Sequence, residues 1–223
     1  MILTGTNIQI EKETAYRLID CYENSPIYGE IEALYEEIKG EMIPLIQARG
    51  VLSFAKTSEL FVDKDCLENE YEEEGSLQRN DLKNKDYALL LYTLGDEISS
   101  YVSSLFSEGD YLKGMLADAM ADSCLFSMEK EWTGILTDEC RKRNLGIEKR
   151  MEAPTDFSME VQKRAWQLLD GASIGIMMTS GAMFSPVKTI CLMFLLTDDV
   201  CQNNTAHDCS RCTNVSCKLR NEK

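Results

Sequence analysis

The stretch from Gly171 to Leu196 constrains the fold most, because it is the longest nearly uncharged run in the chain and Lys188 is its only charge. A break of small residues (Thr-Ser-Gly-Ala) divides it into two apolar pieces, Ser173 to Met178 and Val187 to Leu196. Each piece has the length of a strand, and the second follows Pro186, where a strand can begin but not continue through. The simplest interpretation is two buried neighbouring strands joined by a small-residue loop.

The same stretch is long enough for a membrane span, for which about 20 apolar residues suffice. Gly175, Gly181, Pro186 and Lys188 within it argue against a span. The first residues lack the basic segment and apolar segment of a secretory signal, so we expect a cytoplasmic protein. The net charge of −15 repels phosphate backbones and argues against general nucleic-acid binding.

The remaining periodicities indicate a helix-rich chain with one sheet. Apolar spacings of three and four predict helices over Glu11–Cys21, Ile27–Ile43, Ile98–Phe106, Tyr111 to about Arg143, and Met159–Leu169. Shorter apolar runs predict strands over Thr6–Ile10, Met42–Phe54, Ser58–Val62 and Tyr87–Leu91, with 144–158 irregular. Because strands and helices do not alternate regularly, we expect the α+β class, with a mixed or antiparallel sheet and helices packed beside it.

Two segments stand apart from this core. The acidic segment from Val62 to Gly75 carries seven Asp or Glu against one Lys, which is typical of a solvated loop or helix face, with an acidic docking surface as the alternative. The C-terminal residues are rich in cysteine. We therefore divide the chain into an α+β domain over 1–198 and a cysteine-rich tail over 199–223.

The tail holds four of the nine cysteines: Cys201, Cys209, Cys212 and Cys217. In a reducing compartment such a cluster favours a metal or redox role over disulfides, and thiolate is a strong ligand for zinc and for iron–sulfur clusters. Cys209 and Cys212, with two residues between them, are spaced to reach one metal from a tight turn. The spacing does not distinguish zinc from an iron–sulfur cluster, and His207 is an alternative fourth ligand to Cys201.

A second set of polar residues lies on the long predicted helix and in the segment around Arg150. Asp118 and Asp122 are four residues apart and share a helix face, with Glu129 further along. A solvated face is the simpler interpretation of these acids, although the alanines between them indicate partial burial. An arginine such as Arg150 pairs a ligand carboxylate through two parallel hydrogen bonds. No Ser–His–Asp set, phosphate-binding loop or GxGxxG motif is present, which argues against a hydrolase or a nucleotide-hydrolysing enzyme.

Several stretches, taken in order, resemble the activation (reactivation) domain of cobalamin-dependent methionine synthase in its stand-alone bacterial form. They are Tyr92-Thr93-Leu94-Gly95, Gly109-Asp110-Tyr111-Leu112, the run from Leu116 to Asp122, Gly146-Ile147-Glu148-Lys149-Arg150 with Pro154, Gln162, the run from Ile174 to Met183, and Ser185-Pro186-Val187-Lys188-Thr189. The resemblance covers roughly residues 6 to 196, and it is carried by the order of the motifs. Short members of this family can also end in a cysteine cluster.

The resemblance implies a twisted antiparallel sheet with flanking helices, binding of S-adenosylmethionine, and docking on a corrinoid protein or methyltransferase. Such a domain lets an oxidised cobalamin on its partner be reduced and remethylated, with the electron supplied by a flavodoxin- or ferredoxin-type protein. The expected cofactor-binding residues are Arg150, Pro154, Glu129, Asp118, Asp122, Met183, Pro186 and Lys188. A tail iron–sulfur cluster would relay the electron to cobalt.

The chain departs from the family pattern at two places. Phe126 stands where the family often has a glutamate, and Thr155 follows Pro154 where the family has Gly-Tyr. These departures motivate two alternatives: an iron–sulfur redox protein on the same scaffold without S-adenosylmethionine binding, and a zinc-tailed module that only docks partners.

Overall fold

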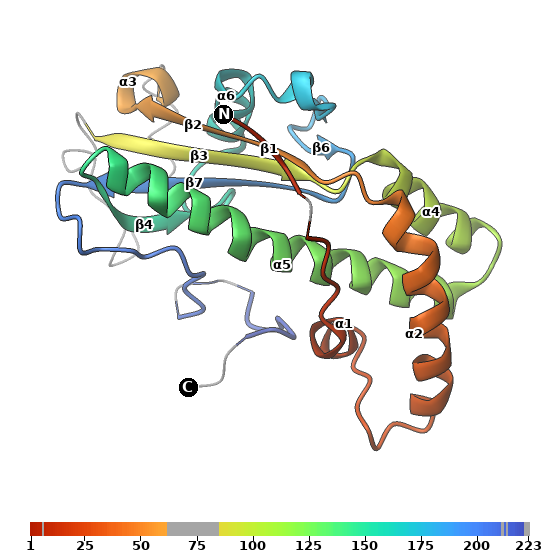
Figure 1. The fold of residues 1–223 in the computed structure, drawn as a ribbon. Helices are drawn as coiled ribbons and strands as arrows, with labels where there is room; N and C mark the ends of the chain where they lie inside the picture. Colours follow the sequence, from red (N-terminus) through yellow and green to blue (C-terminus); the bar gives the residue numbers. More distant parts are fainter. Residues whose placement is uncertain (6, 62–84, 211, 213, 221–223) are drawn as a thin grey trace.

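A five-stranded antiparallel sheet forms the centre of the molecule (Figure 1). The computed structural model describes residues 1–5, 7–61, 85–210, 212 and 214–220. The strand order across the sheet is β1 (Ile2–Thr4), β2 (Arg49–Lys56), β3 (Asp86–Thr93), β7 (Thr189–Thr197) and β4 (Gly146–Met151). Each neighbouring pair is antiparallel, which confirms the predicted α+β class with an antiparallel sheet.

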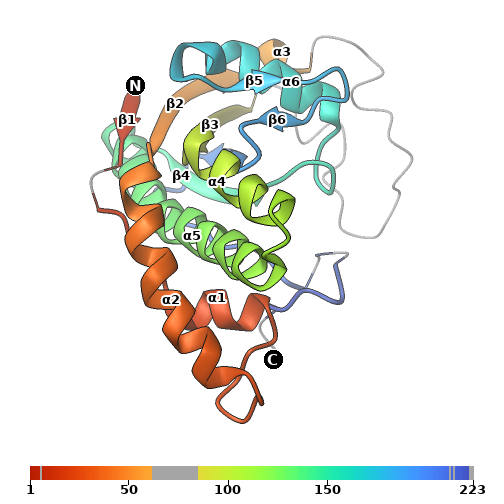
Figure 2. The same ribbon diagram turned by 90° about the vertical axis from the view of Figure 1, so that its right-hand side faces the viewer.

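One face of the sheet is covered by the long helix α5 (Tyr111–Lys142), and α1 (Lys12–Leu18), α2 (Tyr28–Met42) and α4 (Asp96–Ser107) pack around it. Figure 2 shows this helical layer on one side of the sheet and the smaller elements on the other. Trp132 of α5 is 1% exposed and stands edge-on to the Tyr92 ring, with 4.9 Å between the ring centroids. This contact ties the middle of α5 to the central strand β3.

The opposite face is covered by α6 (Met159–Leu168), the short helix η3 (Gly171–Ile174) and a two-stranded hairpin of β5 (Met177–Met178) and β6 (Phe184–Ser185). The apolar side chains of β3 and β7 alternate between this second core and the α5 core. Because both faces are covered, β3 and β7 are nearly continuous apolar runs, as expected of strands buried on both sides.

The structure divides the apolar run that opened the sequence analysis. Its second piece is a strand, β7, as predicted, but its first piece folds mainly as η3 followed by the short β5. The two pieces are not neighbouring strands, because β5 pairs with β6 while β7 lies between β3 and β4. Gly175 explains the difference, since it takes a left-handed conformation (φ 78°) that ends η3 and turns the chain.

The helix predictions are confirmed for α1, α2, α4, α5 and α6, whereas several strand predictions were wrong. Ser58–Val62 was predicted as a strand but contains most of the short helix α3 (Thr57–Leu60), and the first strand lies at Ile2–Thr4 rather than Thr6–Ile10. Met42 ends α2 and is followed by η1 (Ile43–Leu45), whose first turn accommodates Pro44. The segment predicted to be irregular, 144–158, contains β4.

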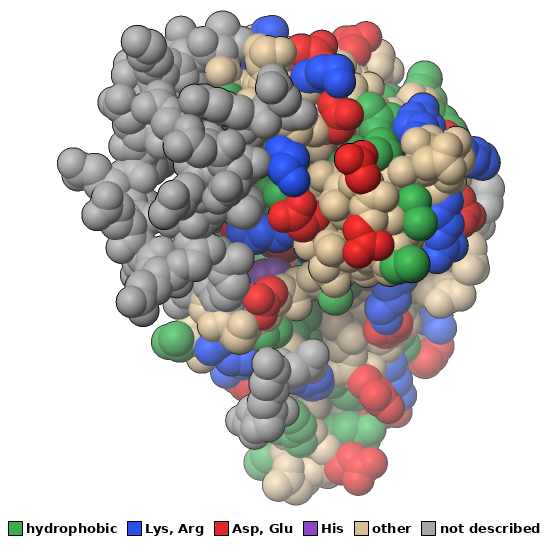
Figure 3. Space-filling view, turned by 90° about the vertical axis from the view of Figure 1, so that its left-hand side faces the viewer, with side chains coloured by type: hydrophobic (Ala, Val, Ile, Leu, Met, Phe, Trp, Pro, Cys, Tyr) green, Lys and Arg blue, Asp and Glu red, His purple; other side chains and the backbone are tan. Residues whose placement is uncertain are grey.

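The charged side chains are dispersed over the part of the surface that Figure 3 shows. Figure 3 shows acidic and basic side chains interspersed over one face of the molecule. No helix in the described part of the chain is long and apolar enough to cross a membrane. The acidic segment from Val62 to Gly75 lies outside the described residues.

Candidate functional site

A β-bulge in β4 aims Arg150 at the long helix. The pairing of β4 with β7 shifts register between Ile147 and Lys149, so Ile147 and Arg150 both lie on the face of the sheet that carries α5. Without the extra residue, strict alternation would place Arg150 opposite to Ile147. Arg150 pairs across the sheet with Phe194, and its side chain is only 10% exposed. Arg150 is therefore a strand residue that is largely buried.

The guanidinium of Arg150 is held by two carboxylates. Glu129 of α5 accepts hydrogen bonds from both Nη1 and Nη2, the latter at 3.1 Å. Glu152 Oε1 lies 2.7 Å from Arg150 Nε, an ion-pair distance, although Nε has no aligned hydrogen bond. Tyr92 donates its hydroxyl to Glu129 Oε2 at 3.3 Å. We call Arg150, Glu129, Glu152 and Tyr92 the Arg150 cluster, and its formal charge is −1 with Tyr92 neutral.

Burial keeps Tyr92 neutral. Loss of solvent raises the pKa of the Tyr92 hydroxyl well above its ordinary value, and the charge of Glu129 raises it further. The hydroxyl is therefore a permanent donor at neutral pH. Its position fixes Glu129 against Arg150 from the sheet side.

The first part of the tail lies along the outer edge of β4 and borders the Arg150 cluster. Asn203 forms a parallel bridge with Ile147, where Ile147 N donates to Gln202 O and Asn204 N donates to Ile147 O, both at 3.0 Å. Further on, the Thr205 carbonyl lies 3.5 Å from Arg150 Nη1, and His207 Nδ1 lies 2.9 Å from Glu152 Oε1. The tail thus protects the exposed edge of the sheet and forms one side of the cluster.

A second cluster surrounds Lys188, which is 6% exposed. Its ammonium lies 2.7 Å from Oδ1 of both Asp118 and Asp122, and it donates to the Asp118 carbonyl at 3.3 Å. Burial raises the pKa of the Asp122 carboxyl above its ordinary value, although Lys188 acts in the opposite direction. We call Lys188, Asp118 and Asp122 the Lys188 cluster, and its formal charge is also −1.

Both clusters are built on one stripe of α5. Asp122 and Glu129 are seven residues apart, so they face the same side of the helix about 10 Å apart along its axis. The sequence analysis had named Arg150, Glu129, Asp118, Asp122 and Lys188, and the structure joins them into these two groups rather than one. It did not name Tyr92 or Glu152 as site residues, although Tyr92 belongs to the first stretch of the family resemblance and Glu152 lies two residues after Arg150.

The other predicted residues lie around these clusters rather than in them. Pro154 is exposed and follows a cis peptide bond after β4, and Pro186 is buried and also follows a cis peptide bond. Met183, in the turn between β5 and β6, is 61% exposed, together with Met177 (57%) and Val187 (76%). These three residues are thus exposed apolar side chains on and next to the β5–β6 hairpin.

The four tail cysteines do not form a metal site as they are placed. Each of Cys201, Cys209, Cys212 and Cys217 is a free thiol, and no group of three or more His, Cys, Asp or Glu among the described residues is arranged to hold a metal ion. The Arg220 guanidinium draws part of the tail together by donating to the carbonyls of Cys209 and Cys212, both at 2.7 Å. The thiols present therefore do not fit a resident metal without rearrangement.

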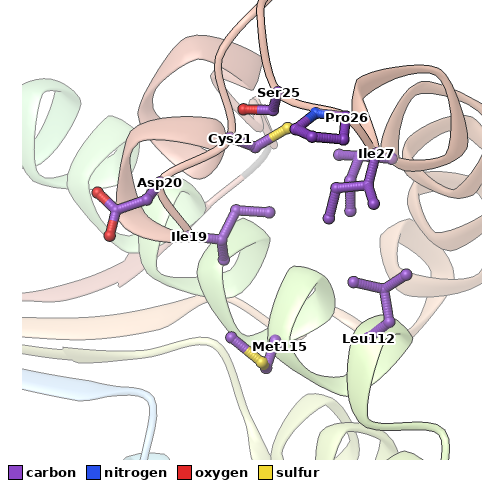
Figure 4. A pocket seen from close by; sticks show the side chains of 9 residues that line it. Ile19, Asp20, Cys21, Ser25, Pro26, Ile27, Leu112 and Met115 are labelled. Atoms are coloured by element: carbon purple, nitrogen blue, oxygen red, sulfur yellow. The ribbon is translucent and has the colours of Figure 1, made fainter.

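A separate apolar hollow of about 270 Å³ lies where the turn between α1 and α2 meets the start of α5. Figure 4 shows Cys21, Ile27, Leu112 and Met115 around it. Lys218 of the tail reaches its border through an ion pair with Asp20, at 2.5 Å. None of the predicted site residues lines this hollow.

Comparison with known proteins gives a likeness in structure and none in sequence. No family model and no curated protein matches the chain. A solved structure, the MetH reactivation domain bound to AdoHcy, superposes with a TM-score of 0.60 over 93% of this chain and 81% of its own, at 11% identity. The chain has the reactivation-domain fold. The resemblance drawn from the motif order is thereby confirmed at the level of the fold, with its twisted antiparallel sheet and flanking helices.

Within this fold, the chain has an arginine on β4 and acidic residues on the long helix that faces it. The sequence departure at Phe126 has a structural counterpart, because Glu129, one turn further along α5, is the residue that pairs with Arg150. The absence of the Gly-Tyr pair after Pro154 leaves an exposed turn in which Asp156 binds Lys149 at 2.6 Å.

Proposed function

We propose that this protein is a reactivation-type accessory protein that binds S-adenosylmethionine and docks on a corrinoid-carrying methyltransferase. The observation that carries the proposal is the reactivation-domain fold, which extends over 93% of the chain and which, in the solved neighbour, holds AdoHcy. AdoHcy is S-adenosylmethionine without its transferred methyl group, so a site for one suits the other.

The Arg150 cluster has the charges that an amino-acid ligand requires. A guanidinium binds a carboxylate through two parallel hydrogen bonds, and carboxylates such as Glu129 and Glu152 bind an ammonium group. S-adenosylmethionine carries a carboxylate, an ammonium and a sulfonium, with a net charge of +1. The cluster, at −1, therefore complements the ligand, and binding requires the ligand carboxylate to displace part of the Glu129–Arg150 contact.

The remaining predicted residues complete the proposal. The Lys188 cluster and the turn from Met183 to Pro186 form the wall along which the rest of the ligand extends. The exposed Met177, Met183 and Val187 supply an apolar docking surface for the corrinoid protein. Once a separate flavodoxin- or ferredoxin-type reductant has reduced the partner's cobalt, the cobalt takes the methyl group and AdoHcy leaves.

Isothermal titration calorimetry with S-adenosylmethionine tests the ligand half of the proposal. We expect saturable binding by the wild type, at least tenfold weaker binding by Arg150→Gln, and weaker binding as salt is raised, because the attraction is between opposite charges. Arg143→Gln is the matched control, since Arg143 pairs with Glu139 in the last turn of α5, and it should bind like the wild type. Absence of heat at millimolar ligand, or equal affinity of Arg150→Gln and the wild type, would contradict the proposal.

A metal in the tail is a second proposal, and it rests on the sequence spacing of Cys201, Cys209, Cys212 and Cys217. Zinc or an iron–sulfur cluster would require the tail to close around it, so no electron-transfer step is assigned to these thiols. Metal analysis after anaerobic purification, with visible absorption, tests it. Bound zinc supports a structural tail, visible absorption supports a redox tail, and protein free of metal contradicts both.

A further inference from the structure

Arg49, the first residue of β2, has a guanidinium that no described residue pairs with. Among the described residues it forms no side-chain hydrogen bond and no ion pair, and its Nε is buried with no acceptor. The residue as a whole is partly exposed, so the outer edge of the guanidinium remains accessible to solvent. A charged group that loses water without gaining a partner costs folding free energy.

The isolation of Arg49 is unusual in this chain. Acidic residues outnumber basic ones, 38 to 23, and other largely buried cations such as Arg150 and Lys188 each hold two carboxylates. Acids are therefore abundant, yet none lies within ion-pair distance of Arg49 in the described part of the chain. The unpaired guanidinium is available to an anion from outside.

The surroundings hold Arg49 in place and add one donor. Thr4 on β1 is directly opposite Arg49, so the two side chains share one face of the sheet, and the exposed Thr4 hydroxyl has no hydrogen-bond partner among the described residues. Thr93 on β3 is the other cross-strand neighbour of Arg49, and its hydroxyl donates to the Lys188 carbonyl and accepts from Gly95 N. Thr93 is thus satisfied, and the free donors are those of Arg49 and Thr4.

Gly175 brings the backbone close to the guanidinium. A Cβ placed on Gly175 would lie 3.4 Å from Arg49 Nη2, so the turn after η3 packs directly against the arginine. The amide of Gly175 already bonds back into η3 and offers no further donor. The site therefore presents a planar fork and one hydroxyl, which match the two oxygens of a monoanion better than the several oxygens of a phosphate.

We propose that Arg49 and Thr4 bind a carboxylate group that the described part of this chain does not supply. The site lies on the face of the sheet opposite to the Arg150 cluster, so the inference is independent of the proposed function. The carboxylate has two sources to distinguish: a small molecule, such as a second S-adenosylmethionine bound apart from the one at the Arg150 cluster, or an Asp or Glu side chain of a docked protein.

NMR of the arginine Nε–H groups tests the site on the full-length protein. We expect the Arg49 signal, assigned by its loss in Arg49→Gln, to shift saturably with sodium acetate at constant ionic strength and not with sodium chloride. The Nε–H of Arg164, which donates to the Glu59 carbonyl at 2.8 Å, is the internal control and should not move. Thr4→Val, which keeps the shape and removes the hydroxyl, should weaken acetate binding severalfold.

Titration with S-adenosylmethionine then separates the two sources. A saturable shift of the Arg49 signal that persists in Arg150→Gln assigns the carboxylate to the small ligand, whereas a response to acetate alone assigns it to a protein side chain. Equal, non-saturable shifts with acetate and chloride would overturn the proposal. So would strong destabilisation by Arg49→Gln, because it would mean that the guanidinium already has a stabilising role within the chain; we expect a melting temperature equal to or above that of the wild type.

Discussion

At the scale of single residues, the described core holds its buried cations by giving each one more than one carboxylate. Lys188 is 6% exposed as a whole residue, and the side chain of Arg150 is 10% exposed. Each of these cations contacts two acids. This arrangement offsets the desolvation of the cation and leaves a local charge of −1. The acids then depend on the cation, because without it two carboxylates would face each other.

Lys188→Met tests that dependence. We expect the free energy of unfolding to fall by about 2 kcal/mol at pH 7, less than for a fully buried pair because Asp118 and Asp122 are partly exposed. The pKa of Asp122 is already raised, and losing Lys188 raises it further. The folded variant then binds protons more readily than the unfolded chain. The loss in free energy of unfolding caused by the substitution therefore becomes smaller as the pH falls toward 4.

Chemical denaturation at pH 7 and pH 4 measures this difference. Lys130→Met is the control, because Lys130 is 71% exposed and its pair with Glu11 should contribute less than about 0.5 kcal/mol. A loss of stability in Lys188→Met that is equal at both pH values would contradict the electrostatic account.

At the scale of elements, long periodic helices were predictable from the sequence and short strands were not. The α5 helix runs for 32 residues, so its apolar spacing dominates local alternatives. By contrast, η3 and α3 contain residues that suit strands, but tertiary packing decided their conformation. In η3, the left-handed Gly175 also contributed. The position of Arg150 depended on a one-residue bulge, which no periodicity in Gly146–Met151 reveals. The acids of the site were therefore predictable, but their division into two clusters was not.

Gly146 at the start of β4 controls how the tail packs on this element. A Cβ at Gly146 would lie 1.9 Å from the Asp199 carbonyl oxygen, a backbone atom that must move. We expect Gly146→Ala to detach the tail from the β4 edge, with faster hydrogen exchange at the amides of Ile147 and Asn204. The rest of the sheet should keep its protection.

Gly134→Ala is the matched control, because a Cβ there meets nothing within 4 Å and Gly134 lies inside α5. It should stabilise the protein by about 0.5–1 kcal/mol, through helix propensity. Unchanged exchange at Ile147 and Asn204 in Gly146→Ala would show that the tail is not held by this close approach.

At the scale of the whole molecule, a single sheet separates two apolar cores. The first lies under α5 and contains Trp132, whereas Trp166 packs against the second, where its indole N–H donates to the Ile176 carbonyl at 2.8 Å. These are the only two tryptophans in the chain. Since β3 and β7 contribute side chains to both cores, neither core can be lost without exposing the other.

We therefore expect both cores to unfold in one transition. In Trp166→Phe, fluorescence follows Trp132 alone, and its denaturation midpoint should coincide with that obtained from far-ultraviolet circular dichroism of the same variant. In the wild type, fluorescence from both tryptophans should give a single transition. Two separated midpoints would contradict this expectation and would mean that the α6 layer unfolds independently.

The place of β7 in the sheet has a consequence for synthesis on the ribosome. This strand lies inside the sheet, between β3 and β4, but spans Thr189–Thr197. Until it has been translated, β3 lacks one neighbour and β4 lacks its strand partner in the described sheet. At about 5–20 residues per second, roughly 5–20 s pass between the synthesis of β3 and that of β7, and during this time apolar strand residues are uncovered. Such a chain completes its sheet only after β7 has been synthesised, and an interrupted translation product that lacks β7 would be a natural client for chaperones.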